Sequence, residues 1–184
     1  LGLAAISTAI LFLILLFVGI FSNGIPGMFQ HYVTLEVTLN QERIDPQGDM
    51  SVESLYAGDA RALVNEALLN TLGNPTGRKA KRAARGIMSS ASDLRLTEFA
   101  LANPSLIGQT VPVKFALDDD IDSFLRGFIS RETPETERRI NDQVIEFVDD
   151  LNDAGRISYE LSDYLFFGSA SRNAEIAGIK GALV

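Results

Sequence analysis

The chain opens with an apolar run that no charged residue interrupts. Leu1–Phe21 holds only two polar side chains, Ser7 and Thr8. At ~1.5 Å of rise per residue, a helix of this length measures about 32 Å, close to the ~30 Å hydrocarbon core of a bilayer. A helix in a soluble core would show a polar face at helical spacing, and this run shows none. The pattern predicts a transmembrane helix over residues 1–22.

A cleaved signal peptide is the nearest alternative for this segment. The apolar region of a signal peptide is typically about 7–15 residues long and ends at a small-x-small cleavage site. Here the run is longer, and it leaves through Ser22–Gly27 (SNGIPG) without such a site. We therefore expect an anchor that stays attached to the protein.

Two later segments alternate between apolar and polar residues, which predicts strands with one buried face. The first is Tyr32–Asn40, whose inward-facing residues would be Val33, Leu35, Val37 and Leu39. The second is Thr110–Leu117, in which Pro112 indicates an edge position or the start of a strand. A short apolar run at Tyr164–Phe167 predicts a third strand, and we expect all three strands to share one sheet.

Apolar residues at helical spacing predict five further helices. Their ranges are Asp59–Leu72, Arg78–Ser90, Asp93–Ala102, Ile121–Gly127 and Pro134–Ala154. The last has the clearest signals, with Thr133 as N-cap and Pro134 in the first turn. Its core-facing stripe consists of Ile140, Val144, Phe147, Val148 and Leu151. Together the elements indicate an α+β fold, a small mixed sheet with several packed helices.

These elements divide the chain into three parts. Residues 1–22 are the membrane helix, and residues 32–175 form one α+β domain. Lys and Arg are absent from residues 22–41, which favours the extracytoplasmic side for this domain. At the end, Ile176, Ile179 and Leu183 keep an amphipathic spacing, so residues 176–184 resemble the approach to a second membrane helix. We expect the chain to be a piece of a longer membrane protein.

Composition narrows the possible functions. The net charge of −8 lies entirely in residues 118–184, and a pI near 4.6 argues against nucleic acid as the main partner. The chain has no cysteine and a single histidine, His31, which excludes zinc sites built from Cys and His. We interpret His31 as an interfacial polar residue beside an aromatic one. No group of residues combines a nucleophile, a base and an oxyanion donor, so we do not expect an enzyme.

An acidic stretch at residues 118–122 (DDDID) begins like a calcium-binding loop. The EF-hand pattern requires Gly at its sixth place and Glu at its twelfth, where this chain has Ser123 and Ile129. Aspartates before a helix also stabilise its N-terminus without a metal. We therefore expect neither a metal nor a cofactor.

The most distinctive charge pattern is basic. No acidic residue lies between Glu66 and Asp93, and five cations gather there: Arg78, Lys79, Lys81, Arg82 and Arg85. Like charges on two helical turns repel one another, so one hypothesis is a partner that neutralises them, such as an acidic protein face, lipid headgroups or a phosphate-like anion. The alternative is a solvated face balanced by the acidic part of the same domain.

Several stretches occur together in an order that matches one family. They are the membrane helix, the strand YVTLEVTLN, residues 101–110 (LANPSLIGQT), the acidic turn at 118–122 and the ending 175–184 (EIAGIKGALV). In this order the chain resembles the N-terminal region of phosphate ABC-transporter permeases of the PstA type, with an enlarged periplasmic insertion after the first helix. The resemblance implies phosphate import through the bacterial inner membrane. It also implies a second permease subunit, a cytoplasmic ATPase subunit and a periplasmic phosphate-binding protein as partners.

The resemblance assigns no transport-path residue to this chain, so we predict that the basic stretch is a partner-docking patch. The extracytoplasmic sensing domain of a membrane receptor is the alternative, because a helix followed by an α+β domain is also the plan of such receptors. The two hypotheses differ in what would follow Val184. A permease requires five or more further apolar spans, whereas a receptor requires one span and a signalling module.

Overall fold

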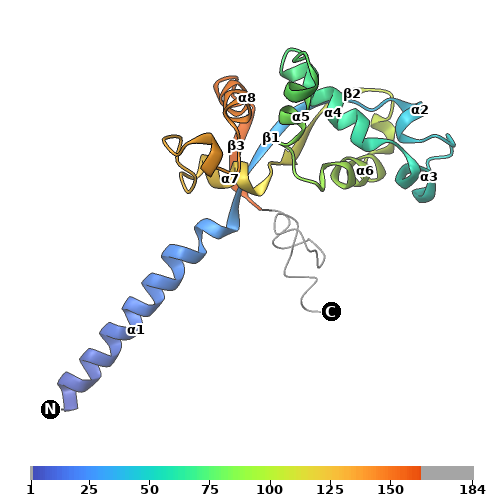
Figure 1. The fold of residues 1–184 in the computed structure, drawn as a ribbon. Coiled ribbons are helices and arrows are strands. Elements are labelled where there is room, and N and C mark those ends of the chain that lie inside the picture. Colours follow the sequence, from blue (N-terminus) through green and yellow to red (C-terminus); the bar gives the residue numbers. More distant parts are fainter. Residues whose placement is uncertain (1, 163–184) are drawn as a thin grey trace.

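The computed structural model describes residues 2–162, and Figure 1 shows their path. Helix α1 (Gly2–Gly24) projects away from the other elements as a single rod. Within the described residues it is the one helix long and apolar enough to cross a membrane, as the sequence predicts. It gives way to a 3-10 turn, η1 (Pro26–Met28), where proline lacks the N–H that a further helical turn requires.

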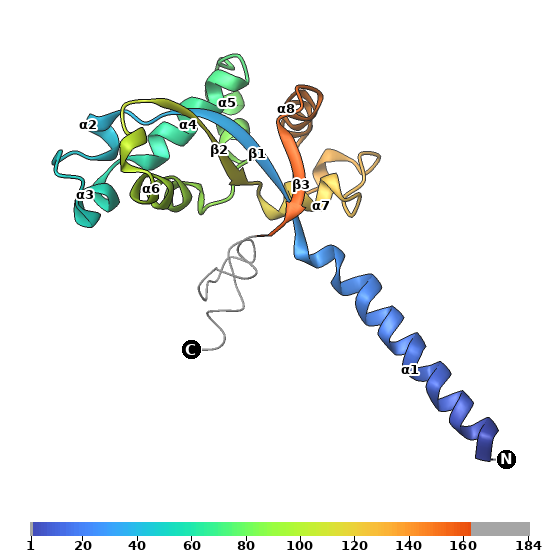
Figure 2. The same cartoon turned by 180° about the vertical axis from the view of Figure 1, so that it is seen from behind.

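A three-stranded sheet forms the centre of the domain. Strand β1 (Phe29–Thr38) lies between β2 (Thr110–Ala116) and β3 (Ile157–Leu161), as Figure 2 shows from behind. Both pairings are antiparallel, whereas we expected a mixed sheet. The first two strands were predicted within a few residues. The third strand of the described chain is β3, and the predicted strand at Tyr164–Phe167 lies outside the described residues.

The two faces of the sheet differ in polarity, as the alternation of β1 requires. The predicted inward residues are fully buried: Val33, Leu35, Val37 and Leu39. The opposite face carries polar side chains, and there Lys114 of β2 donates to Glu160 of β3 across β1, with the nearer carboxylate oxygen at 2.6 Å. The helices therefore cover one face and leave the other polar.

The first group of helices lies between β1 and β2 in the sequence. These elements are α2 (Gln41–Ile44), α3 (Val52–Ala57), α4 (Ala60–Thr71), α5 (Arg78–Arg85), α6 (Ser92–Ala102) and the 3-10 turn η2 (Pro104–Leu106). Helix α4 packs against β1, α5 and α6. Its start is capped by the Asp59 side chain, and the chain turns away at Gly73 with φ of +70°. Helix α5 is shorter than predicted because Gly86 follows it and Met88 forms a β-bridge with Leu117.

The second group follows β2. Helix α7 (Asp119–Leu125) starts two residues before its predicted position, because the Asp118 side chain caps it. The 3-10 turn η3 (Glu135–Glu137) and helix α8 (Asp142–Asp153) replace the predicted single helix over Pro134–Ala154, which was wrong at its start. Pro134 has an extended backbone with ψ of 143°, and the Asn141 side chain accepts the N–H of Val144 at 3.0 Å. Asn141 is therefore the N-cap, rather than Thr133.

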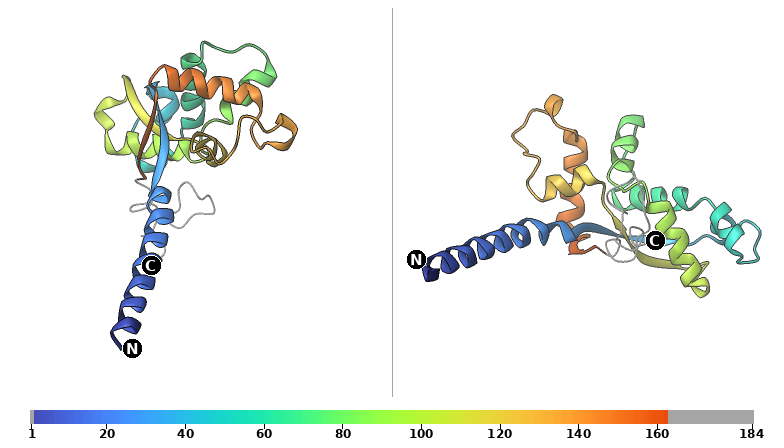
Figure 3. Two further views of the ribbon diagram at one scale, coloured as in Figure 1. Left: turned by 90° about the vertical axis from the view of Figure 1, so that its left-hand side faces the viewer. Right: turned by 90° about the horizontal axis from the view of Figure 1, so that it is seen from below.

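One hydrophobic core joins the sheet to both groups of helices. The predicted stripe is buried in this core, with Ile140 just before α8 and the others on it: Val144, Phe147, Val148 and Leu151. Helix α8 also packs against α5, which brings the second group beside the first. The α+β class predicted from the sequence is confirmed. Figure 3 shows that the domain lies at one end of α1, so that the helix and the domain form two distinct parts.

Candidate functional site

The five predicted cations of the docking patch lie together on α5. We call Arg78, Lys79, Lys81, Arg82 and Arg85 the basic face, and all five side chains are exposed. The other side of the same helix consists of buried alanines, namely Ala80, Ala83 and Ala84. Their spacing of three and four residues places them on one stripe. The sequence thus fixes which side of α5 faces the core.

The small size of these alanines determines how α5 is held. Helix α5 packs against both α4 and α8, and alanine lets helix backbones approach closely. It begins after Gly77, whose φ of +91° lies in the region that glycine adopts readily. The basic face therefore lies on a short helix whose opposite side packs against two other helices, α4 and α8.

The cations of the basic face differ from other surface cations in their ion pairing. None of the five cations forms an ion pair with another residue in the described range 2–162. Cations elsewhere on the surface do, as in the pairs Arg43–Glu66 at 2.9 Å and Arg61–Asp93 at 2.8 Å. The basic face is thus a local source of positive potential on an acidic protein.

Two surface pockets adjoin the basic face. One of about 370 Å³ lies between α5 and the start of α8, with Lys79, Arg82 and Arg139 on its wall together with Asp118 and Asp120. Arg139 is paired with Asp120 at 3.2 Å. A second pocket of about 330 Å³ lies beyond Gly86 and is lined by Arg85, Arg61, Asp93 and three serines: Ser89, Ser90 and Ser92. Because acidic groups share both walls, neither pocket presents the uniform set of donors that a dedicated anion site requires.

The acidic stretch at residues 118–122 is used by the fold itself. Asp118 accepts the N–H of Asp120 at 3.0 Å, Asp120 pairs with Arg139, and Asp122 joins a network described below. Among the residues that the structure describes, no three His, Asp or Glu side chains are grouped so that they could hold a metal ion.

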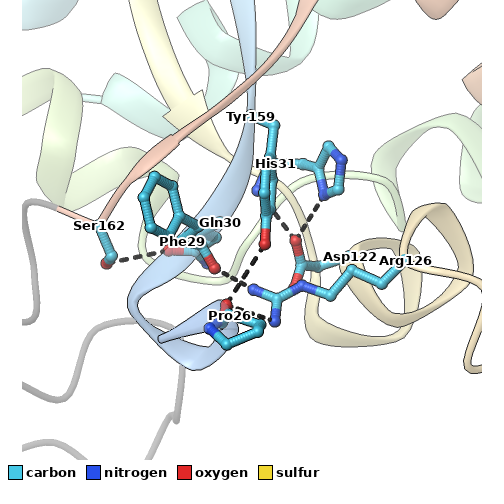
Figure 4. A network of polar contacts seen from close by, with 8 residues as sticks. All are labelled: Pro26, Phe29, Gln30, His31, Asp122, Arg126, Tyr159 and Ser162. Atoms are coloured by element: carbon cyan, nitrogen blue, oxygen red, sulfur yellow. Dashed lines mark hydrogen bonds and ion pairs between the residues drawn. The ribbon is translucent and has the colours of Figure 1, made fainter. Parts of the chain in front are cut away.

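Figure 4 shows a polar network at the point where α1 meets the domain. Asp122 of α7 accepts the backbone N–H of His31 at 2.9 Å, and its Oδ1 lies 2.7 Å from the Nδ1 of the same histidine. Its second oxygen lies 2.8 Å from the Nε of Arg126, one turn further along α7. These side chains are mostly shielded from solvent, because Asp122, His31 and Arg126 are only 14%, 15% and 16% exposed.

Arg126 extends this network to the segment that follows α1. Its guanidinium donates to the carbonyl of Pro26 at 2.9 Å and to the carbonyl of Phe29. It also lies over the ring of Tyr159, 5.5 Å from the centroid, and the Tyr159 hydroxyl donates to the same Pro26 carbonyl at 3.3 Å. The segment that leaves α1 is thereby tied to both α7 and β3.

Sequence reasoning missed this network. His31 does lie beside an aromatic ring, but the ring is that of Tyr159, with centroids 4.5 Å apart, and its polar partner is 91 residues away. One signal was present: His31 has the same parity in β1 as the buried Val33 and Leu35, so it points to the covered side of the sheet. A polar residue on that side requires a partner.

Comparison with known proteins links the chain to a family without an assigned function. The family model described as "Domain of unknown function (DUF3333)" matches residues 1–135. This range includes α1, the basic face, and His31, Asp122 and Arg126 of the polar network, and it ends before α8 and Tyr159. No curated protein and no solved structure matches the chain.

Proposed function

Since the chain belongs to the DUF3333 family, whose description assigns no function, we propose from its own residues that it is the anchor and extracytoplasmic docking domain of a phosphate importer permease. In this proposal α1 spans the bacterial inner membrane and the α+β domain lies on the periplasmic side. The resemblance of several sequence stretches to permeases of the PstA type supports it, as does a first helix of membrane-spanning length.

The basic face is the observation that carries the docking role. A selective phosphate site requires a few donors fixed in a pocket that excludes water. The basic face instead offers five exposed cations on a helix supported from behind. Such an array attracts an acidic surface over a distance and orients it, which raises the rate of association more than the specificity for a small anion.

The partner that fits this surface is a protein with an acidic patch. In a phosphate importer the anion is delivered by a periplasmic binding protein and crosses between two permease subunits, while a cytoplasmic ATPase supplies the energy. The binding protein and the second permease subunit are on the same side of the membrane as the domain in this proposal. Either of them can meet the basic face, whereas the ATPase subunit cannot.

Neutralising the basic face tests this role. Replacing all five residues with Gln should slow phosphate uptake at low ionic strength and reduce the dependence of the uptake rate on salt, because the attraction that salt screens has been removed. Assembly of the transporter in the membrane should be unchanged, since the five side chains are exposed and the buried alanines remain. Uptake is measured in cells or vesicles over a range of salt concentrations.

The chain offers a control with the same change in net charge. It replaces with Gln five cations that already pair with described carboxylates: Arg43, Arg61, Lys114, Arg131 and Arg156. We expect this variant to keep the salt dependence of the wild type. Equal uptake by the wild type and the basic-face variant at every salt concentration would show that the face is only solvated. Micromolar phosphate binding by the isolated chain that the variant abolishes would favour the sensing or capture role instead.

A further inference from the structure

Large apolar side chains are exposed at two ends of the domain. Apart from α1 and the isolated Leu94, one group lies around α3 and consists of Met50, Val52 and Tyr56. The other consists of Ile25, Phe128, Tyr159 and Leu161, and we call it the apolar collar. Phe128 is the most exposed large apolar residue that the structure describes, at 75%.

Hydrogen bonds place the collar around the root of α1. Tyr159 donates to the carbonyl of Pro26, and Leu161 pairs with Phe29 at the start of β1. Phe128 follows Arg126, which donates to the same Pro26 carbonyl, and Gly127 between them turns the chain with φ of +80°. The collar therefore lies next to Pro26–Phe29, the segment that connects α1 to the sheet.

The arrangement of the elements agrees with these contacts. In Figure 1, α7 and the loop that follows it lie at the end of the domain that α1 enters, whereas α3 lies at the opposite end. Tyr159 and Leu161 lie on the same side of β3 as Ile157, the side that the helices cover elsewhere in the sheet. Both side chains are exposed, so the helices do not cover this end of β3. The two apolar groups are thus at different distances from the membrane helix.

The end of the apolar run sets the depth of the collar. The run ends at Phe21, and Ser22, Asn23 and Gly24 follow it, so residues just beyond Gly24 reach the headgroup layer when α1 spans the bilayer. That layer adds about 5–8 Å on each side. Groups bonded to Pro26 lie within it, and aromatic side chains are favoured at that depth.

We propose that the apolar collar docks into the headgroup layer of the bilayer, with Phe128 inserted at the boundary of the acyl chains, so that the domain is seated on the membrane surface. This inference rests on the proposed anchoring role of α1. Several acidic residues follow Phe128, namely Glu132, Glu135 and Glu137, and these limit insertion to the tip of the loop. The interaction is with the apolar–polar boundary of the lipid rather than with anionic headgroups.

Tryptophan fluorescence tests the proposal directly, because the chain contains no tryptophan. Phe128→Trp in the full chain, reconstituted in phosphatidylcholine vesicles, should emit at shorter wavelength than a water-exposed tryptophan. Lipids brominated near the headgroup end of the acyl chains should quench it. Tyr56→Trp is the matched control, since Tyr56 is also an exposed aromatic, at 55%, but lies in the other apolar group. We expect several-fold weaker quenching at position 56.

A third variant tests separately whether α1 is inserted in the bilayer and whether the collar docks on its surface. Phe12→Trp lies in the middle of α1 and should be quenched by lipids brominated near the free ends of the acyl chains if the helix is in the bilayer. Quenching at position 12 with no more quenching at 128 than at 56 would overturn the collar and leave the anchor intact. Absence of quenching at all three positions would overturn both. A blue-shifted emission at 128 without quenching would also overturn the proposal, because it would place a protein partner or a second copy there.

Discussion

Asp122 and Arg126 lie one turn apart on α7 and together join the domain to the segment that enters it from α1. The Nε of Arg126 is 2.8 Å from the Asp122 carboxylate, and the two side chains bind the backbone of His31, Pro26 and Phe29. Arginine suits this position because its planar group donates in several directions at once. This pair therefore ties the segment that follows α1 to the end of α7.

Loss of Arg126 should therefore loosen the helix root. Arg126→Met keeps the aliphatic length but removes the cation beside Asp122 and the guanidinium donors to the carbonyls of Pro26 and Phe29. We expect a loss of about 1.5–3 kcal/mol in the free energy of unfolding, the range for hydrogen bonds to charged groups. Amide exchange at residues 28–31 should also become faster. Arg139→Met is the control, because its pair with Asp120 involves an 80% exposed arginine and such pairs contribute about 0–1 kcal/mol. Equal losses in both variants would contradict a specific role for Arg126.

Helix α8 provides a test of the core. Phe147 is buried in the central cluster, so Phe147→Ala should lower the free energy of unfolding by about 3–5 kcal/mol through lost burial and a cavity. Glu146→Ala, at the exposed neighbouring position, should change it by less than about 0.5 kcal/mol. Chemical denaturation of the detergent-solubilised chain measures both. A loss below about 1 kcal/mol for Phe147→Ala would show that α8 does not contribute to the core as described.

Gly58 is required for a close approach rather than for an unusual backbone conformation. Its φ is −66°, but a Cβ atom there would lie 2.4 Å from the carbonyl oxygen of Ile44. Gly58→Ala should cost about 1–3 kcal/mol, as overpacking does. Gly27→Ala has no atom within 4 Å of the added methyl group and should be nearly neutral. If the two variants unfold at the same denaturant concentration, α2 and α3 do not pack as closely as described.

The Lys114–Glu160 pair on the polar face of the sheet should produce a pH dependence. The hydrogen bonds from Lys114 lower the pKa of Glu160 below its ordinary value. A carboxyl whose pKa is lower in the folded state stabilises the fold above its unfolded pKa, about 4.3 for Glu, and loses this effect as pH falls through the lowered value.

Glu160→Gln should accordingly be less stable than the wild type near neutral pH and equally stable in strong acid. The difference at neutral pH should be small, about 0.2–1 kcal/mol, because both side chains are substantially exposed. Thermal unfolding followed by circular dichroism from pH 2 to pH 7 measures the two curves. A constant difference over this whole range would argue against titration of Glu160 as its cause.

Features that depend only on residues close together in the sequence were predicted. The alternation from Val33 to Leu39 identified both the strand and its buried face, because burial on one side imposes a period of two. The five cations of the basic face were grouped from the sequence because no acidic residue lies between Glu66 and Asp93. Whether these cations form ion pairs depends on carboxylates from distant parts of the sequence. Only the structure shows that described carboxylates pair with other cations.

The sequence analysis missed features that depend on a choice between two local signals or on contacts between distant residues. Two N-cap signals lie before α8, and Asn141 prevails over Thr133 because Pro134 adopts an extended conformation. Strand β3 has the alternation of a strand over only five residues, and the more apolar run that follows concealed it. The contact of His31 with Asp122 joins residues that no periodicity relates, so the network at the helix root could not be derived from the sequence.

The absence of cysteine makes the central claim, an extracytoplasmic domain anchored by α1, open to direct measurement. Single cysteines introduced at Glu53 and Glu146 would be exposed, whereas the neighbouring Ser54 is buried against Asp45 and unsuitable. A membrane-impermeant maleimide is added to intact cells whose outer membrane has been permeabilised. The account predicts that both cysteines are labelled before the inner membrane is broken. Labelling of both only after the inner membrane is broken would place the domain in the cytoplasm and contradict the account.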